Sequence, residues 1–143
     1  MIDHIGLAVS DLPAARAFYE AALAPLGIAV LIEVTEEMTG GQGAHLGLGR
    51  DGSPAFWIGT GRPPTTGAHL ALAAPDRAAV ADFHAAALAA GGRDNGAPGL
   101  RPHYHPGYYA AFVLDPDGHN IEAVCHDGAM ADEGAMPDEG GAA

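Results

Sequence analysis

The fold is decided by two stretches of equal length: residues 4–27, HIGLAVSDLPAARAFYEAALAPLG, and residues 69–92, HLALAAPDRAAVADFHAAALAAGG. They align without a gap at an offset of 65 residues and are identical at 11 of 24 positions, five of which are alanines. The other six identities keep the order of a strand, a turn acid, a helix and a closing glycine: His4, Leu7, Asp11, Phe18, Leu23 and Gly27 each recur 65 positions further on. Such an ordered match predicts a duplicated supersecondary unit.

Each copy opens with a short apolar run, followed by an aspartate and an alanine-rich stretch. This order predicts a strand and then a helix, because an aspartate accepts from the unpaired N–H groups of a helix start and a glycine suits its end. Strand-like runs follow at residues 28–36, 44–50 and 54–59 in the first half, and at 108–115 and 119–126 in the second, after a short link near 92–94. The sequence therefore predicts an α+β fold in which each half is a strand, a helix and three strands.

The acidity of the chain excludes several classes of partner. Its 18 acidic and 6 basic residues give a formal net charge of −12, which repels nucleic acid and anionic membranes. No apolar run approaches the ~20 residues that a bilayer span requires. The single cysteine, Cys125, cannot form an internal disulfide, and the N-terminus lacks the basic start of a secretory signal. We therefore expect a cytoplasmic protein that binds neither nucleic acid nor membrane.

The last residues differ in composition from the rest of the chain. GAMADE at 128–133 is followed at once by GAMPDE, and the segment 127–143 holds five acids and no base. Residues 1–126 alone carry a formal charge of −7. We expect one domain over residues 1–126, made of modules 1–62 and 65–126, and an acidic low-complexity tail that is either a solvated extension or a tether across a partner subunit.

Three residues are candidates for a metal site. His4 and His69 hold the same place in the two copies, so two modules that face each other would bring their imidazoles together. Glu122 falls inside a strand, where a carboxylate is costly unless it is paired or bound to a cation; aligning the two Asp-Gly turns gives Phe56 as its counterpart. The alternative is that Glu122 faces solvent from an edge strand and that each histidine only makes a structural hydrogen bond.

Three segments resemble the vicinal oxygen chelate superfamily, which includes glyoxalase I, fosfomycin-resistance enzymes, extradiol dioxygenases and bleomycin-resistance proteins. They are DHIGLAVSDLPAARAFYEAAL, GAHLALAAPDRAAVADFHAAAL and, most specific of the three, FVLDPDGHNIEAV. The resemblance implies paired βαβββ modules forming a curved mixed sheet that encloses a metal or ligand site, and a homodimer. It also implies that His4, His69 and Glu122 bind a divalent metal, for which Fe, Mn, Ni, Zn and Co are all compatible.

One departure from glyoxalase I bears on function. That enzyme has a fourth, acidic ligand on the last strand of its first module, where this chain has AFWI at 55–58. The resemblance therefore implies a metal-dependent lyase or isomerase, related to lactoylglutathione lyase but not a true glyoxalase I, that chelates two oxygens of a small metabolite or xenobiotic. Two alternatives stay open: an Fe(II) dioxygenase of the same superfamily, and a small-molecule-binding protein of the bleomycin-resistance type that is not an enzyme.

The segment RPHYHPGYY at 101–109 gathers two histidines, three tyrosines and an arginine just before a strand. These types suit proton transfer, hydrogen bonding to a developing oxyanion and clamping of an anion. His103 or His105 is the candidate for proton transfer, and Tyr108 or Tyr109 is the candidate donor to the oxyanion. Arg101 is the candidate clamp for an anion. The alternative is that the segment serves packing alone. Trp57 and Phe56 are expected to form an apolar wall of the substrate pocket, although core packing suits Phe56 better.

Overall fold

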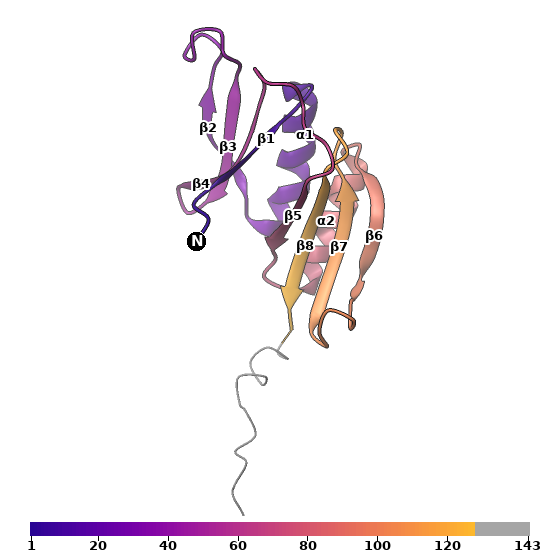
Figure 1. The fold of residues 1–143 in the computed structure, drawn as a ribbon. Coiled ribbons are helices and arrows are strands. Elements are labelled where there is room, and N and C mark those ends of the chain that lie inside the picture. The colour runs from indigo at the N-terminus through magenta and orange to yellow at the C-terminus, as the bar shows by residue number, and fades with distance from the viewer. Residues whose placement is uncertain (128–143) are drawn as a thin grey trace, which may run out of the picture.

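The computed structural model describes residues 1–127, so the predicted acidic tail, apart from Asp127, lies outside the described residues. Both halves contain the predicted strand, helix and three further strands (Figure 1). The first half consists of β1 (Ile5–Ala8), α1 (Leu12–Leu23), the 3-10 helix η1 (Ala24–Leu26), β2 (Ala29–Val34), β3 (His45–Arg50) and β4 (Ser53–Gly59). The second consists of β5 (His69–Ala73), α2 (Arg77–Ala89), β6 (Arg93–Leu100), β7 (Tyr108–Leu114) and β8 (Asn120–His126). The duplicated unit of the sequence is thus a duplicated unit of the fold.

Each half forms its own mixed sheet of four strands. The strand order is β1-β4-β3-β2 in the first, which we call sheet A, and β5-β8-β7-β6 in the second, sheet B. In both sheets the first strand pairs parallel with the last strand of its module, and the other neighbours are antiparallel. The α+β class and the paired modules are confirmed, but within residues 1–127 the strands form two open sheets and not one continuous sheet.

Two aspartates start the helices, as predicted. Asp11 accepts a hydrogen bond from the backbone N of Ala14 at 2.9 Å, and Asp76 accepts one from Ala79 at 2.8 Å. Each cap stabilises its helix by ~1 kcal/mol because the first N–H groups have no intrahelical partner. Gly27 follows η1 at φ 73°, a left-handed conformation that glycine adopts without strain. No helix within residues 1–127 is long and apolar enough to cross a membrane.

The sequence predicts three strands after the helix of the second half but locates only two of them, and the one it did not locate is β6. Its sequence is RDNGAPGL, and glycine, proline, aspartate and asparagine are all depleted in strands. They are tolerated here because β6 lies at the edge of sheet B, where a proline need not donate to a neighbouring strand. The pairing with β7 is also irregular, with register shifts between Asp94 and Gly99.

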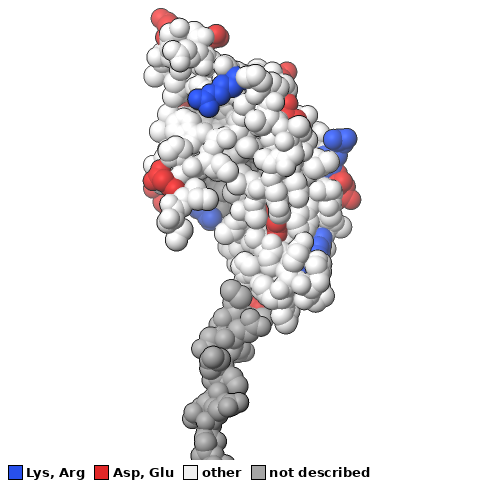
Figure 2. Space-filling view, in the orientation of Figure 1, with Lys and Arg blue, Asp and Glu red and all other residues white. Residues whose placement is uncertain are grey.

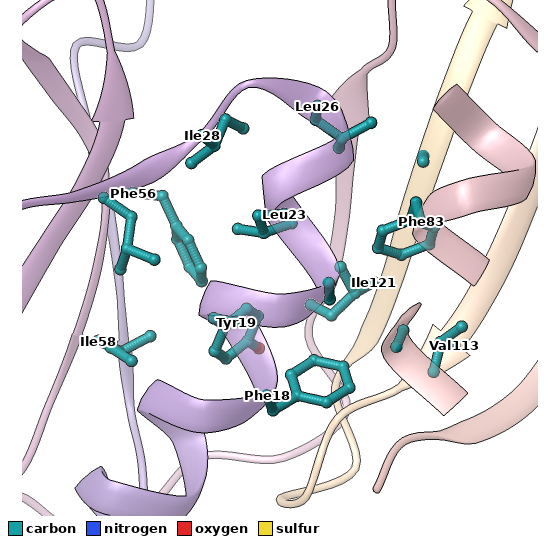
Figure 3. Close-up of a cluster of buried hydrophobic side chains, with 14 of the residues drawn as sticks. Phe18, Tyr19, Leu23, Leu26, Ile28, Phe56, Ile58, Phe83, Val113 and Ile121 are labelled. Carbon is teal, nitrogen blue, oxygen red and sulfur yellow. The ribbon is translucent and has the colours of Figure 1, made fainter. Parts of the chain in front are cut away.

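One hydrophobic core serves both halves. Helix α1 lies between the two sheets (Figure 1), and α2 packs on α1 and on β6, β7 and β8. The ring of Tyr19 packs edge-on against Phe56 of sheet A, while the neighbouring Phe18 points toward Val113 of sheet B (Figure 3). All four side chains are at most 3% exposed. The helices therefore cover the inner face of each sheet and leave both outer faces without a helix.

Two hairpin turns join the halves. Asp117, in the β7–β8 turn, accepts a hydrogen bond from the backbone N of Ser10 at 3.1 Å. In the opposite direction, Arg50 at the β3–β4 turn donates to the backbone oxygen of Ala73 at 3.4 Å. Each turn thus contacts the strand-to-helix region of the other module, as expected of two copies related by an approximate two-fold axis.

Candidate functional site

Most of the predicted site residues lie on the outer faces of the two sheets. Successive side chains of a strand point to opposite faces. On β8, Ile121 and Ala123 belong to the core, so Glu122 between them faces outward. The register places Phe112 of β7 on one side of Glu122 and Ala71 of β5 on the other.

Glu122 is a buried carboxylate although its sheet face carries no helix. Its side chain is only 2% exposed because neighbouring side chains lie over it. His69 Nε2 is 2.8 Å from Oε2, and the Tyr108 hydroxyl donates to Oε1. No Arg side chain within residues 1–127 forms an ion pair with Glu122, so its charge is met by an imidazole and a phenol alone.

Tyr108 is held in its protonated form. Burial, followed by the hydrogen bond to Glu122 and the charge of that carboxylate, raises the pKa of the Tyr108 hydroxyl well above its ordinary value. A proton on this oxygen is therefore retained at neutral pH. The hydroxyl acts as a donor that fixes Oε1 of Glu122 and leaves Oε2 directed at His69, a half-exposed side chain.

Arg101 and Phe112 extend the same face toward β6. The Arg101 guanidinium donates to the backbone oxygen of Ala97 at 2.7 Å and lies 5.4 Å from the centre of the Phe112 ring. Phe112 in turn neighbours His69, with ring centres 6.2 Å apart. Within residues 1–127 Arg101 has no carboxylate partner, so its charge is available to an anion that approaches this face.

The loop before β7 adds histidines and tyrosines beside Tyr108. His105 Nε2 lies 2.8 Å from Nδ1 of His126 and the two rings stack, while the ring of Tyr108 packs edge-on against both. Tyr104 links His103 to Tyr108, with ring centres 4.2 and 4.9 Å away. The structure thus places the candidates His103, His105 and Tyr108 in one group and adds His126, which was not selected from the sequence.

Tyr109 does not belong to this group, which corrects its assignment as a hydrogen-bond donor to substrate. It follows Tyr108 on the strand and therefore points to the opposite, helix-covered face, where it packs against the core. The guanidinium of Arg77 lies 4.7 Å from its ring centre. Cys125, on the same face, is buried, and burial raises the pKa of its thiol, which favours an unreactive thiol.

His4 is not brought to His69 and Glu122. It precedes β1 on sheet A, and its Nδ1 lies 2.7 Å from the Asp3 carboxylate. In the part of the chain that the structure describes, no three His, Cys, Asp or Glu side chains are grouped so that they could hold a metal ion. The prediction that the two modules face each other and join their imidazoles is wrong within one chain, because the helices occupy the space between the sheets.

The strand register also corrects the predicted counterpart of Glu122. Gly6 of β1 pairs with Trp57 of β4, and Ala71, 65 residues after Gly6, pairs with Glu122. Trp57 and not Phe56 is therefore the equivalent of Glu122, at the same offset of 65. Phe56 faces the core, is 3% exposed and contacts Tyr19, so it forms no wall of an outer-face pocket.

Trp57 lies in a cleft on the outer face of sheet A. The cleft has a volume of about 500 Å³, and its lining includes His4 and the β4 strand with the segment that follows it. Its polar side chains, apart from His4, are those of His45, Thr60, Arg62 and Thr65. His45, Thr60 and Arg62 were not selected from the sequence as site residues. A signal for a cleft was present in the alternation HLGLGR of β3, whose leucines face the core and whose glycines leave the outer face of the strand without side chains.

Comparisons with known proteins agree with this architecture. A model of the Glyoxalase/Bleomycin resistance protein/Dioxygenase superfamily matches residues 1–123. The solved structure of a glyoxalase/bleomycin resistance protein from Albidiferax ferrireducens T118 is 30% identical, with a TM-score of 0.66 over 85% of this chain and 95% of that one. A glyoxalase/bleomycin resistance protein/dioxygenase family enzyme from Burkholderia phytofirmans PsJN is 20% identical, with a TM-score of 0.60 over 86% and 96% of the two chains.

Glyoxalase I from Zea mays has the same fold within a longer chain. It is 20% identical, with a TM-score of 0.67 over 86% of this chain and 43% of the maize chain, so the present chain spans less than half of that enzyme. A comparison with curated protein sequences gave no match. The matched residues cover the first module and the second as far as Ala123, including Glu122, and this chain belongs to the Glyoxalase/Bleomycin resistance protein/Dioxygenase superfamily.

Proposed function

We propose that this protein is a metal-dependent lyase or isomerase, glyoxalase-like but not a true glyoxalase I, that acts on a small oxygenated metabolite or xenobiotic. The observation that carries the proposal is the buried carboxylate of Glu122, held by His69 and Tyr108 and paired with no arginine among residues 1–127. Burying a carboxylate in this way costs several kcal/mol. A bound divalent ion is the simplest partner that would offset that cost.

The donor set fits such an ion. An imidazole nitrogen and a carboxylate oxygen are ligands that Fe(II), Mn(II), Ni(II), Zn(II) and Co(II) all accept, and Nε2 of His69 and Oε2 of Glu122 are already neighbours at 2.8 Å. The third ligand would be His4, whose Nδ1 contacts Asp3. A carboxylate that orients an imidazole through its second nitrogen is a common companion of a metal-binding histidine.

A homodimer would bring the three ligands together. His4 and the pair His69–Glu122 lie on the outer faces of sheets that share one core, so they cannot meet within a chain. A second copy that places the outer face of its sheet A over the outer face of sheet B would supply the missing histidine. Each dimer would then hold two sites, with ligands from both subunits in each.

The surrounding residues suit a reaction at two adjacent oxygens. A divalent ion held there supplies Lewis-acid stabilisation to the oxygens of a chelated substrate. Tyr108 keeps its proton and fixes one carboxylate oxygen of Glu122, Arg101 offers a positive charge to an anionic substrate, and Phe112 excludes water between them. His105, stacked on His126, is the proposed group for proton transfer, with His103 as the second candidate.

A metal-free binding protein of the bleomycin-resistance type is the second candidate. The observation that favours it is the lack of a three-ligand cluster within residues 1–127 of one chain, together with a cleft on sheet A large enough for a small molecule. In that case His69 and Glu122 would serve each other as a hydrogen-bonded pair and nothing more.

Elemental analysis separates the two candidates. Protein freed of metal by a chelator and then reconstituted should bind about one divalent ion per chain. His69→Ala and Glu122→Gln should weaken that binding by more than about 100-fold, because loss of a group that merely orients a ligand already costs ~10–100-fold. His84→Gln is the matched control, since His84 pairs with Asp94 away from the site. A wild-type chain that takes up no divalent ion would overturn the enzyme proposal and leave the binding protein.

Mixing two variants tests the shared site. His4→Ala and Glu122→Gln should each lose metal, but unfolding and reassociating them together should restore about a quarter of the wild-type sites, because half of the dimers are then mixed and one of their two sites is intact. No recovery would contradict a site shared between subunits. Where metal binds, oxygen consumption on catechol would indicate the dioxygenase, and substrate proton exchange without oxygen uptake the isomerase or lyase.

A further inference from the structure

The cleft on sheet A differs in charge from the rest of the molecule. Residues 1–126 carry a formal charge of −7, yet no Asp or Glu lines the cleft or the smaller hollow of about 390 Å³ that adjoins it around Thr39 and Gln42. Both share His45, Thr60 and Arg62. On the face shown in Figure 2, charged side chains are scattered over a mostly uncharged surface. The cleft and the hollow share one arginine and hold no carboxylate, so their charge is opposite in sign to the net charge of the protein.

Two glycines shape the floor of the cleft. A Cβ on Gly47 would lie 2.9 Å from two carbons of the Trp57 indole, and a Cβ on Gly59 would lie 2.0 Å from Nδ1 of His45. The indole therefore lies across Gly47 of the neighbouring strand, and the imidazole lies across Gly59. Trp57, which is partly exposed, thus offers a flat aromatic surface to anything that enters the cleft.

The polar end of the cleft is fixed by a close crossing of two backbone segments. A Cβ on Gly43 would lie 2.4 Å from the oxygen of Thr60, and one on Gly61 would lie 2.0 Å from the oxygen of Gln42. Both glycines have positive φ, 96° and 87°, so no other residue fits this crossing without strain. The segment that carries Thr60, Gly61 and Arg62 is therefore held against the 42–43 loop.

The donors at this end are free to bind an anion. Arg62 makes no ion pair with any Asp or Glu side chain in residues 1–127. The Thr60 hydroxyl accepts a hydrogen bond from Ala44 N at 3.0 Å, so its own hydrogen remains to be donated. Among residues 1–127, the only carboxylate bonded to a residue that lines the cleft is that of Asp3, which contacts His4 and not Arg62.

We propose that this cleft binds the carboxylate of a planar, aromatic substrate, with the carboxylate between Arg62 and Thr60 and the ring over Trp57. In one respect the inference rests on the proposed function: it names the class of substrate that the proposed enzyme would take. The binding itself requires no metal. Stacking on an indole and a charge-assisted hydrogen bond to a guanidinium select for a flat body and a negative charge together.

Trp57 is the only tryptophan of the chain, so its fluorescence reports on the cleft directly. The metal-free protein, in the presence of a chelator, is titrated with benzoate and with its neutral analogue benzamide. Benzoate should change the Trp57 emission saturably and bind about tenfold more tightly than benzamide. Arg62→Gln should weaken benzoate binding by about tenfold and leave benzamide unchanged, because only the charge contact is lost.

Arg93→Gln is the matched control, since Arg93 is an exposed arginine at the start of β6 on the other sheet, and it should bind benzoate like the wild type. Equal binding of benzoate and benzamide, benzoate binding unchanged by Arg62→Gln, or no fluorescence change with benzoate would each overturn the proposal. Far-UV circular dichroism checks that each variant is folded. The titration is done without metal, so the two proposals fail separately. A protein that takes up no metal but binds benzoate would contradict the proposed enzyme and keep this subsite. A protein that binds metal but not benzoate would contradict the subsite alone.

Discussion

Position 57 and position 122 occupy the same place in the two modules and carry different chemistry. The paired strands align Gly6 with Trp57 and Ala71 with Glu122. One module therefore presents an indole where the other presents a carboxylate. The two outer faces therefore differ in chemistry: sheet B carries the proposed ligands His69 and Glu122, and sheet A carries the aromatic floor of a cleft.

A buried tyrosine links the two modules at the residue scale. Tyr19 of α1 is fully buried, and its hydroxyl donates to Asp115 at 2.5 Å, just before the β7–β8 turn. Burial, followed by the charge of Asp115, raises the pKa of the Tyr19 hydroxyl far above its ordinary value. The folded protein thus retains a proton that the unfolded chain releases near pH 10.

This raised pKa predicts a loss of stability in alkali. The contribution of the neutral hydroxyl is complete below about pH 10 and declines as the pH rises toward the folded-state pKa, by ~1.4 kcal/mol of unfolding free energy per pH unit. Tyr19→Phe should remove that part of the slope. Urea unfolding at pH 8, 10 and 11 measures it, with the exposed Tyr104→Phe as control. Equal slopes for the wild type and Tyr19→Phe would contradict the argument.

At the scale of elements, the two matched glycines that follow the helices serve different purposes. Gly27 is needed for its positive φ of 73°, and nothing lies within 4 Å of where its Cβ would be. Gly92 is needed for space: a Cβ there would lie 2.6 Å from Cγ1 of Val113 and 2.7 Å from Cε2 of Phe18. Glycine thus occurs at both positions for different reasons: Gly27 allows a left-handed turn, and Gly92 allows close contact between the two modules.

Alanine substitutions should separate these two reasons. Gly92→Ala should lower the unfolding free energy by ~1–3 kcal/mol through overpacking, and Gly27→Ala by ~1 kcal/mol through backbone strain. Adding Val113→Ala should recover part of the loss in Gly92→Ala, because it removes the methyl group in the way, and should only add to the loss in Gly27→Ala. Urea unfolding of the two double-mutant cycles measures this. Simple additivity in both would rule out the steric explanation.

At the scale of the whole molecule, the two modules share one core. Buried residues of both helices and both sheets form a single cluster, and a module of about 60 residues has little apolar surface to bury by itself. The outer faces remain open, and they carry the proposed ligands and the cleft. The two copies thus form one folding unit with two open outer faces.

A shared core predicts one cooperative unfolding transition. Far-UV circular dichroism, which reports on both modules, and Trp57 fluorescence, which reports on the first, should give the same urea midpoint. Fragments 1–62 and 65–126 should each be unfolded alone, because neither retains the other half of the core. Separate midpoints, or a folded fragment, would show that the modules are independent units.

Much of the fold follows from the sequence, for local physical reasons. The offset of 65 residues, the aspartates before each helix and the alternating apolar runs predict two modules of strand, helix and three strands. The aspartates and the apolar runs act over a few neighbouring residues, and the offset is found by comparing the sequence with itself, so none of these signals depends on the tertiary structure. The position of β6 was not predicted because its glycines and proline are tolerated at a sheet edge, and an edge is a property of the assembled sheet.

The site depended more on tertiary structure. Residue types and spacing selected His69, Glu122, Tyr108 and Arg101 as separate candidates, and the structure places them on one face, since strand alternation and strand pairing bring them together within a single module. Sequence could not place His4, because its distance from His69 depends on whether the sheets or the helices of the two modules face each other. In this protein the helices of the two modules face each other, because they bury their apolar sides between the sheets. The proposed ligands are therefore left on opposite outer faces.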